Sequence, residues 1–333
     1  MKIAVFGAGS IGCHLGGTLA EAADVTLIGR PSVFDALRAE GLTLTGGGRP
    51  VKRVEADALS LATGPEAAAD ADYVLVTVKS GATAQAAAEL AGAGGDAVVV
   101  SFQNGLHNPS VLREGLPGRT VLAGMVPYNV ARTSPAHFHQ GTAGRLMLDD
   151  GPRTAPLVEA MKRAGLDVEA RGDMPGVQYS KLLMNLNNAV NALSGLPLRD
   201  QLGQRAYRSC LALCQREALA AYRAAGIRPA KMGPVAPGFM PVVLGLPDGL
   251  FRWLAASALR VDAQARSSMQ DDLRNGRATE IGELQGEVVA LAERHGVPAP
   301  ANGRLVELVR EAEAAQAAPT WTGEGLLGEL RAP

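Results

Sequence analysis

The sequence has few of the residues that build disulfide frameworks or attract polyanions. It contains only three cysteines among 333 residues, Cys13, Cys210 and Cys214, an odd number without metal-ligand spacing. This number excludes a disulfide framework, suggests no metal site and is typical of a reducing compartment. Lysine plus arginine number 32 against 33 aspartate plus glutamate, a formal net charge of -1. Such a chain has no general attraction to nucleic acid or to an anionic membrane.

Long apolar runs are missing as well. No stretch reaches the roughly 18 apolar residues that cross a membrane. The N-terminal residues Met1 to Phe6 lead straight into glycines, without the apolar core of a signal peptide. We therefore expect a cytoplasmic protein that binds neither nucleic acid nor membrane.

The chain does have length and apolar content. Its 333 residues exceed one typical domain and suit two. A content of 47% apolar and 20% charged residues allows sizeable cores and argues against disorder. These values predict a bilobal protein with a cleft.

The two halves differ in pattern. The first alternates short β-rich runs with Ala-rich helical stretches, which is typical of a parallel sheet covered by helices. The expected strands are Lys2–Phe6, Val25–Ile28, Tyr73–Val78, Ala97–Ser101 and Val121–Met125, with a hairpin around Gly46–Gly48 and further sheet in residues 126–149. After about Arg171, long Ala/Leu-rich segments of helical spacing dominate. We predict an α/β domain over residues 1–170 and an all-α domain over residues 171–333.

Two segments of the second half are expected to be irregular. Residues 228–250 contain five prolines, which exclude a continuous helix. This segment is either a solvated loop or one that covers substrate or contacts another subunit. The tail from Pro319 onward is rich in glycine and small residues, and we expect it to be weakly ordered.

A glycine-rich motif follows the first expected strand. The residues Gly7-Ala8-Gly9-Ser10-Ile11-Gly12 fit the pattern G-x-G-x-x-G and precede an expected helix. Glycines at this spacing allow a tight turn, close approach to a pyrophosphate and close packing of helix on sheet, with the phosphates at the helix N-terminus. The position at the start of a βαβ series favours dinucleotide binding over a merely structural turn.

The end of the second strand bears on the choice of dinucleotide. An acidic residue there would bind the 2'-hydroxyl of NAD, whereas a cation favours the 2'-phosphate of NADP. Here Gly29 and Arg30 follow the strand, and no acidic residue occurs before Asp35. The planar guanidinium of Arg30 suits a phosphate. The alternative is an ordinary surface arginine, so the pattern favours NADP(H).

Residues 181–191 predict an unusual helix, because its four asparagines are poor helix formers. At about 100° per residue, Lys181, Asn185 and Asn188 share one stripe. That stripe could present one ammonium and two amides to a polar cleft. The alternative is buried asparagines bonded to neighbouring backbone.

A second polar segment runs from Ser267 to Ile281 and leads into an amphipathic helix. Its apolar stripe is expected to contain Ile281, Leu284, Val288 and Leu291. Thr279 suits the N-cap, and Glu280 in the first turn would interact with the helix dipole. This capping role is the alternative to a chemical role for Glu280.

The remaining nucleophile and base candidates form no motif. His107, His137, His139 and His295 pair with no serine or cysteine in a recognisable pattern, and we interpret them as structural or solvated. Cys13 begins the helix after the glycine motif, where a thiol pKa could be lowered. A packing role is the other interpretation of Cys13.

Taken in order, these motifs resemble those of ketopantoate reductases. The resemblance runs from about residue 1 to 312 and rests on the glycine motif, Lys79 after Val76-Thr77-Val78, Gln103-Asn104-Gly105, the Lys181 helix, and Ser268-Met269-x-x-Asp272 followed by Thr279-Glu280-Ile281. It implies a Rossmann-type NADP-binding domain followed by an all-α domain like the C-terminal domain of 6-phosphogluconate dehydrogenase. It also implies NADPH-dependent reduction of 2-dehydropantoate, a small 2-keto acid, to pantoate.

The resemblance assigns roles to individual residues. It implies that Lys181 is the general acid, that Glu280 contacts this lysine and the substrate hydroxyl, and that Ser268 receives the substrate carboxylate. It further implies that Asn104 and Asn185 position substrate and cofactor.

Two more positions complete the implied site. Lys79 would lie by the nicotinamide ribose. The family usually has a second helix asparagine eight residues after the lysine, but position 189 is Ala and Asn188 is the nearest candidate. This departure puts ketopantoate itself in doubt more than keto-acid reduction.

Other functions remain open at this point. The same machinery could reduce a different 2-keto acid or a related carbonyl compound. A non-catalytic NADPH-binding regulator would need none of Lys181, Asn185, Ser268 and Glu280. The apolar stripes of the helical half could bury a homodimer interface or be satisfied internally.

Overall fold

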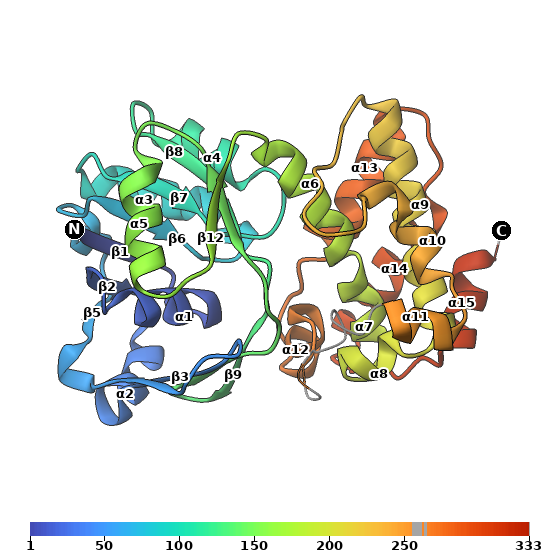
Figure 1. Cartoon of the computed structure of the whole chain (residues 1–333), viewed down its shortest axis with the longest axis horizontal. Coiled ribbons are helices and arrows are strands. Elements are labelled where there is room, and N and C mark those ends of the chain that lie inside the picture. The colour runs from blue at the N-terminus through green and yellow to red at the C-terminus, as the bar shows by residue number, and fades with distance from the viewer. Residues whose placement is uncertain (255–261, 263–264, 333) are drawn as a thin grey trace. The chain divides into compact units, whose positions relative to one another are not determined.

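The computed structural model of the chain describes residues 1–254, 262 and 265–332. The chain forms two compact units, unit 1 from Met1 to Met174 and unit 2 from Pro175 to Pro333 (Figure 1). Each unit has its own secondary-structure class.

Unit 1 is α/β. Its strands are β1 (Lys2–Phe6), β2 (Asp24–Ile28), β3 (Leu42–Gly46), β4 (Lys52–Val54), β5 (Ser60–Ala62), β6 (Tyr73–Val76), β7 (Val98–Ser101), β8 (Val121–Met125), β9 (Val130–Ser134), β10 (His137–Gln140), β11 (Leu146–Asp149) and β12 (Val168–Arg171). Its helices are α1 (Ser10–Leu19), α2 (Pro31–Glu40), α3 (Thr83–Ala93), α4 (Asn108–Gly115) and α5 (Thr154–Arg163), with short turns η1 (Ala56–Ala58), η2 (Pro65–Ala68) and η3 (Ser80–Ala82).

The main sheet of unit 1 has the order β12-β11-β8-β7-β6-β1-β2-β5. All neighbouring strands are parallel except β11 and β8. The chain starts in the middle of the sheet and reverses its direction of winding between β1 and β6, which is the switch point where such sheets bind ligands. The Rossmann-type fold expected from the sequence is confirmed.

Alternate residues of the central strands enter two separate cores. Val98 and Val100 pack with residues of α1, α2 and α5, whereas Val99 packs with residues of α3 and α4. Helices therefore cover both faces of the sheet, which explains the nearly continuous apolar sequence of its strands.

A small second sheet has the order β4-β3-β10-β9. The expected hairpin around Gly46–Gly48 is present, since β3 and β4 are antiparallel and all three glycines have positive φ angles. Leu42, Leu44 and Phe138 are buried in the core that also contains α1 residues. The small sheet thus supports the helix that follows the glycine motif.

The described residues of unit 2 form helices joined by turns and loops, and none of them forms a strand. It contains α6 (Met174–Asn185), whose first residue belongs to unit 1, and then α7 (Asn187–Ser194), α8 (Leu198–Leu202), α9 (Arg205–Ala224), η4 (Pro237–Phe239), α10 (Met240–Leu244), α11 (Asp248–Leu254), α12 (Ser268–Arg274), the π-helical η5 (Gly282–Gly286), α13 (Glu287–Arg294), α14 (Pro300–Ala314) and α15 (Gly323–Arg331). The long helix α9 contacts α7, α8, α10, α13, α14 and α15. The expected all-α second half is confirmed.

The two segments expected to be irregular have different outcomes. Residues 228–250 form only short helical pieces, as the prolines require. The expectation of a weakly ordered tail is wrong, because Trp321 N–H donates to the Leu193 carbonyl and Tyr207 Oη donates to the Trp321 carbonyl. Leu326 and Leu330 of α15 are buried, and this helical spacing outweighs the glycines around it.

The three cysteines are free and buried. Burial raises the pKa of Cys13 to about 12 and that of Cys210 to about 12. The expectation that the start of α1 could lower the thiol pKa of Cys13 is therefore wrong, because this side chain belongs to the core of unit 1.

Among the described residues, no helix has the length and apolar character needed to cross a membrane.

Candidate functional site

The glycine motif forms a tight turn after β1. Gly7 has a φ of +115°, and a Cβ there would lie 2.8 Å from the Val78 amide nitrogen. A Cβ on Gly12 would lie 2.1 Å from the Gly7 carbonyl oxygen, so neither glycine can be replaced without a shift of backbone. Gly9, in contrast, is exposed and would have nothing within 4 Å of its Cβ. The turn therefore leaves open space beside Gly9, where a ligand can approach the backbone.

The start of α1 offers donors to an anion. Gly9 occupies the N-cap position and supplies no side-chain cap to the first turn, which Ser10 and Ile11 begin. The first amides of a helix have no partner within the helix and favour a bound phosphate. Ala8 is buried, and a Cβ on Gly29 would lie 2.7 Å from the Cβ of Ala8. The glycine turn and the end of β2 thus pack closely, and the donor set fits a pyrophosphate.

Two exposed cations follow the strands on either side of β1. Arg30 comes two residues after β2, at the N-cap of α2. Lys79 comes three residues after β6, at the N-cap of η3. Since β1 pairs with both β2 and β6 in parallel, both cations stand at the same edge of the sheet as the glycine turn.

Hydrogen bonds fix the loop that carries Asn104. Ser80 Oγ donates to the Asn104 carbonyl at 2.9 Å, and Gln103 Nε2 donates to the Val78 carbonyl at 3.1 Å. Gln103 Nε2 also donates to Thr83 Oγ1 at 2.7 Å. The loop after β7 is therefore tied to the loop after β6.

The strand β6 ends earlier than the sequence predicted. Val76 is its last residue, not Val78, and the hydroxyl of the next residue, Thr77, donates to the Gly7 carbonyl at 2.7 Å. This bond connects the glycine turn to the segment that carries Lys79.

Four adjacent parallel strands thus bring together at their ends the residues Gly7–Gly12, Arg30, Lys79 and Asn104, and we name this set the cofactor half-site. Its donors and open space fit a nicotinamide dinucleotide.

In unit 2, Lys181 lies on α6. Desolvation lowers the pKa of its ammonium group to about 8. Asn185 ends the same helix and is buried. The expected single helix is divided at Leu186, whose carbonyl accepts a hydrogen bond from Gln285 Nε2 at 2.8 Å, and α7 begins at the next residue.

Ser268 is the first residue of α12 and is exposed. The preceding Ser267 caps this helix through Gln270 N–H and also bonds to α7. Its amide donates to Asn191 Oδ1 at 2.9 Å, and its hydroxyl donates to the Asn188 carbonyl at 3.2 Å. These bonds place Ser268 beside the asparagine-rich helix, although about 80 residues separate them in sequence.

The asparagines of the helix have divided roles. Asn187 exchanges hydrogen bonds with Gln201 at 3.1 and 3.2 Å, and Asn191 bonds the backbone of Leu196 and of Ser267. The alternative of buried asparagines bonded to backbone therefore fits Asn191, whereas Asn187 is buried but bonds another side chain. Asn188 is half-buried, whereas Ala189 is fully buried, so the position eight residues after Lys181 faces the core.

Glu280 lies in a bend two residues before the helical turns begin at Gly282. The expected first-turn position is wrong, because the helix starts later, with the π-helical segment η5. The expected apolar stripe is present, since Ile281 and Leu284 are buried. Thr279 Oγ1 accepts the Ile281 amide at 3.2 Å, and the Thr279 amide donates to the Glu313 carboxylate at 2.6 Å. The backbone next to Glu280 is thereby held from both sides.

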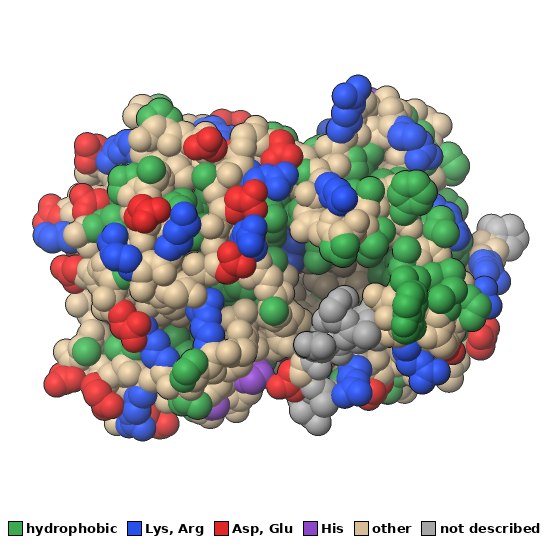
Figure 2. All heavy atoms as spheres, viewed as in Figure 1, with side chains coloured by type: hydrophobic (Ala, Val, Ile, Leu, Met, Phe, Trp, Pro, Cys, Tyr) green, Lys and Arg blue, Asp and Glu red, His purple; other side chains and the backbone are tan. Residues whose placement is uncertain are grey.

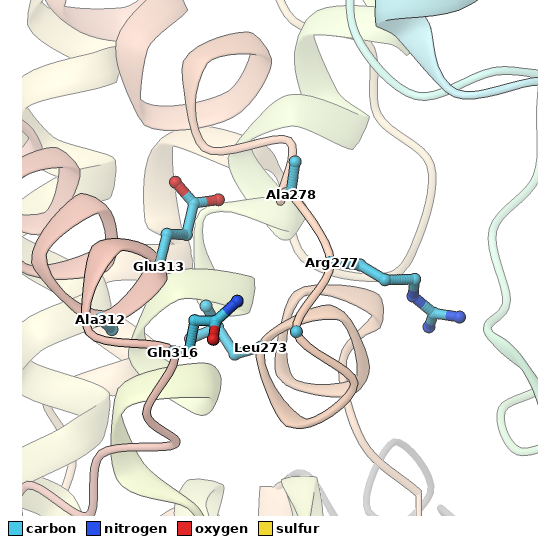
Figure 3. Close-up of a pocket in the computed structure, with 7 residues that line it drawn as sticks. Leu273, Arg277, Ala278, Ala312, Glu313 and Gln316 are labelled. Atoms are coloured by element: carbon cyan, nitrogen blue, oxygen red, sulfur yellow. The ribbon is translucent and has the colours of Figure 1, made fainter.

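A hollow of about 210 Å³ lies behind this bend, lined by Leu273, Gly276, Arg277, Ala278, Ala312, Glu313 and Gln316. Figure 3 shows Glu313 and Gln316 from the α14 side facing Leu273 and Ala278, while the side chain of Arg277 points away. None of the expected substrate-binding residues lines it, so we do not assign it to the keto-acid site.

Sequence reasoning missed several supporting residues. Gln103, Ser267, Gln285 and Glu313 each fix the backbone of a candidate site residue or of its neighbour. Gln103 and Ser267 lie inside motifs that the sequence singles out. No sequence motif pointed to Gln285 or Glu313, because their hydrogen bonds span 99 and 34 residues.

Within the described residues, no group of three or more His, Cys, Asp or Glu side chains could hold a metal ion.

Comparison with known proteins gives concordant matches. The family model described as ketopantoate reductase PanE/ApbA matches residues 3–153, and the model of its C-terminal domain matches residues 173–313. A 2-dehydropantoate 2-reductase of Halobacterium salinarum is 33% identical over 94% of this chain and 99% of its own length. A reductase of the same name from Pyrococcus horikoshii is 26% identical over 94% of this chain and 98% of its own.

Solved structures agree. A PanE/ApbA family ketopantoate reductase from Ralstonia eutropha JMP134 matches with a TM-score of 0.80 and 31% identity, over 95% of this chain and 99% of its own. A D-mandelate dehydrogenase solved with NADH and anilino(oxo)acetate shares the fold, with a TM-score of 0.77 and 18% identity over 95% and 99% of the two chains. Both family models and a relative above 30% identity cover nearly the whole chain, which therefore belongs to the ketopantoate reductase family.

Proposed function

We propose that the chain catalyses the NADPH-dependent reduction of 2-dehydropantoate to pantoate, with Lys181 as the general acid. The observation that carries the proposal is the combination, in one chain, of an open glycine turn in unit 1 and a desolvated lysine in unit 2 whose pKa is lowered to about 8. A regulator that only senses the cofactor would need the first feature and not the second.

The proposed roles follow from charge. When bound, the cofactor supplies a hydride to the carbonyl carbon of the keto acid. The Lys181 ammonium stabilises the negative charge that grows on the carbonyl oxygen and gives that oxygen its proton. A pKa near 8 leaves most of the amine protonated at neutral pH while making it a better acid than a free lysine. Glu280 interacts with the amine and with the new hydroxyl.

The substrate carboxylate is proposed to bind at Ser268. This serine is exposed at the first turn of α12, where its hydroxyl can donate to an anion. The amides of Asn185 and Asn188 would orient the remainder of the keto acid. Asn104 would help position substrate and cofactor, and Lys79 would lie by the nicotinamide ribose.

NADP(H) is the proposed cofactor because of Arg30. Its guanidinium is exposed beside the glycine turn, and the residue before it is Gly29. A 2'-phosphate would find a planar cation there, whereas the 2'-hydroxyl of NAD would lack a carboxylate partner.

The test follows NADPH and NADH absorbance with a panel of 2-keto acids for wild type, Lys181→Ala and Lys162→Ala. We expect the Lys181 variant to lose about a hundredfold to ten-thousandfold in turnover with unchanged NADPH affinity in a fluorescence titration. Lys162 is an exposed lysine of α5 and its variant should behave as wild type. Near-normal turnover of Lys181→Ala would remove the acid role.

A second candidate substrate is a different 2-keto acid. The observation that favours it is Ala189, which occupies the family's usual asparagine position and is buried. In the same panel, activity with other keto acids but not with 2-dehydropantoate would support this candidate, and no activity with any would support a regulator.

We also propose that the chain is a homodimer and works in the cytoplasm. Five of the eight exposed large apolar side chains among the described residues lie between Phe239 and Leu254. Figure 2 shows apolar side chains gathered on the surface of unit 2. A solved ketopantoate reductase from Staphylococcus aureus is dimeric, at 16% identity and a TM-score of 0.69 over 95% of this chain and all of its own.

A further inference from the structure

Two histidines of unit 1 converge on one hydroxyl group. His137 Nε2 lies 2.7 Å and His139 Nδ1 lies 2.8 Å from the Oγ1 of Thr45. His137 and His139 are two residues apart on β10, so their side chains leave the strand on the same face. The sequence had suggested only structural or solvated roles for both.

The register explains why the three side chains meet. Strand β10 pairs in parallel with β3, with His139 opposite Thr45 and His137 opposite Thr43. Phe138 and Leu44 are buried on the other face of this small sheet, in the core that contains α1 residues. The two histidines are half-buried on the outer face. Figure 2 shows histidine side chains at the surface of unit 1.

A hydroxyl group can donate only one hydrogen, so Thr45 donates to one imidazole and accepts from the other. At least one ring therefore presents an unprotonated nitrogen to the hydroxyl. A shift of the proton between the two nitrogens of the second ring would leave both nitrogens that face the hydroxyl unprotonated. At 2.7 and 2.8 Å, each of these nitrogens is about as far from Thr45 Oγ1 as neighbouring ligands of one metal ion are from each other.

We propose that His137, His139 and Thr45 form a binding site for a divalent first-row transition metal, with Cu²⁺ bound most tightly. Imidazole nitrogens are preferred ligands of copper, nickel and zinc, and affinity in this series is greatest for copper. Metal–nitrogen bonds are about 2.0–2.1 Å, so both rings would rotate to turn their lone pairs from the hydroxyl oxygen toward the metal ion. Water would complete the coordination.

One cation on the same sheet face, Arg53, does not oppose the site. Arg53 lies opposite Thr43 in the register of β4. Its guanidinium is paired with the Glu55 carboxylate at 3.1 Å and bonds the Glu40 carbonyl. Its charge is therefore partly neutralised, and a bound cation would meet little repulsion.

The test titrates the untagged chain with CuCl₂ and NiCl₂ by calorimetry and records electron paramagnetic resonance of the copper complex. We compare wild type with His137→Gln, His139→Gln and the matched control His295→Gln, an exposed histidine of unit 2. We expect one copper per wild-type chain with nitrogen hyperfine splitting. Each of the first two variants should weaken binding by about tenfold or more, and the control should not.

Thermal unfolding gives an independent measurement. A cation that binds only the folded sheet raises the melting temperature. Copper should therefore raise the melting temperature of wild type and of His295→Gln but not that of the double variant of His137 and His139. Each variant without metal should keep the wild-type circular dichroism. Equal copper affinity in wild type and double variant, or no binding to wild type, would overturn the proposal.

Discussion

The ammonium group of Lys181 loses much of its hydration in the fold, and desolvation lowers its pKa to about 8. A general acid acts only while it is protonated. The activity of the reductase should therefore be full below this pKa and fall as the pH rises through about 8. A lysine that merely binds substrate charge would give the same limb, so a variant that keeps the charge but donates protons poorly is needed to separate the two roles.

The measurement is the pH profile of kcat/KM for reduction, in wild type and in Lys181→Arg. Arginine stays protonated at all accessible pH values but is a poor proton donor. We expect a large loss of rate in the variant and disappearance of its alkaline limb near pH 8. An unchanged limb in Lys181→Arg would assign it to another group.

His14 sets a second pH dependence, this time of stability. Its ring is buried on α1 and meets the Tyr128 ring edge to face at 5.4 Å between centroids. Burial, and then the charge of Arg49, lower its pKa to about 4, and the nearby Gln140 side chain opposes this in part. The folded chain keeps the ring neutral, whereas the unfolded chain protonates it below about 6.5.

The free energy of unfolding of unit 1 should therefore be highest above about pH 6.5 and decline toward pH 4, by about 3 kcal/mol for this group. Denaturant unfolding at several pH values, followed by tyrosine fluorescence, measures it. The decline should be smaller in His14→Gln and unchanged in His295→Gln. Identical pH dependence in wild type and His14→Gln would contradict the account.

At the scale of elements, one arginine organises the proline-rich segment. Arg208 on α9 is fully buried and donates to the carbonyls of Leu202, Leu244 and Leu246. It also pairs with the Asp248 carboxylate at 2.8 Å, and its guanidinium lies 4.1 Å from the centroid of the Phe251 ring. Arg208 thus ties the segment that contains α10 and α11 to α9 through several bonds of one side chain.

Replacing Arg208 by Met should leave these carbonyls without a donor and destabilise unit 2 by about 3 kcal/mol. Limited proteolysis should then cut within residues 237–254. Arg205→Met is the control, because Arg205 is exposed on the same helix and bonds only one carbonyl of the segment, that of Gly245. Equal protease resistance of the two variants would refute the anchoring role.

The elements that the sequence predicted well are those defined by local patterns. The strand and glycine turn of residues 2–12 follow from apolar residues next to required glycines, and the change of class near residue 171 follows from periodicity. The failures involve distant partners. Helix α15 depends on contacts of Trp321 with Leu193 and Tyr207, and the division at Leu186 coincides with a bond from Gln285. No local pattern contains these pairs.

For the candidate site, too, local patterns predicted some residues, and others depend on distant partners. Lys181, Asn185 and Ser268 stand out because polar residues interrupt apolar helices, which local reasoning detects. Two positioning contacts depend instead on how α12 and α14 pack. They are the bond of Ser267 to α7 and the bond by which Glu313 holds the bend at Glu280. Sequence therefore indicates which residues carry chemistry more readily than which residues position them.

For the whole molecule, the apolar side chains between Phe239 and Leu254 give the dimer proposal a direct test. Val242 is 62% exposed in that stretch, and Val51 is 69% exposed in unit 1. Light scattering after size-exclusion chromatography should give the mass of two chains for wild type and Val51→Glu, and of one chain for Val242→Glu. A charge desolvated in an apolar interface is costly, whereas one at a free surface is not. A single-chain mass for wild type would end the proposal.

The three buried thiols have a practical consequence. Since Cys13, Cys210 and Cys214 are inaccessible and burial raises the pKa of each thiol, the folded chain should react slowly with maleimides. A cysteine introduced on the surface would then be the one site that takes a fluorophore, with the native residues left in place. The same sulfur atoms, released only on unfolding, would report loss of structure as a burst of alkylation.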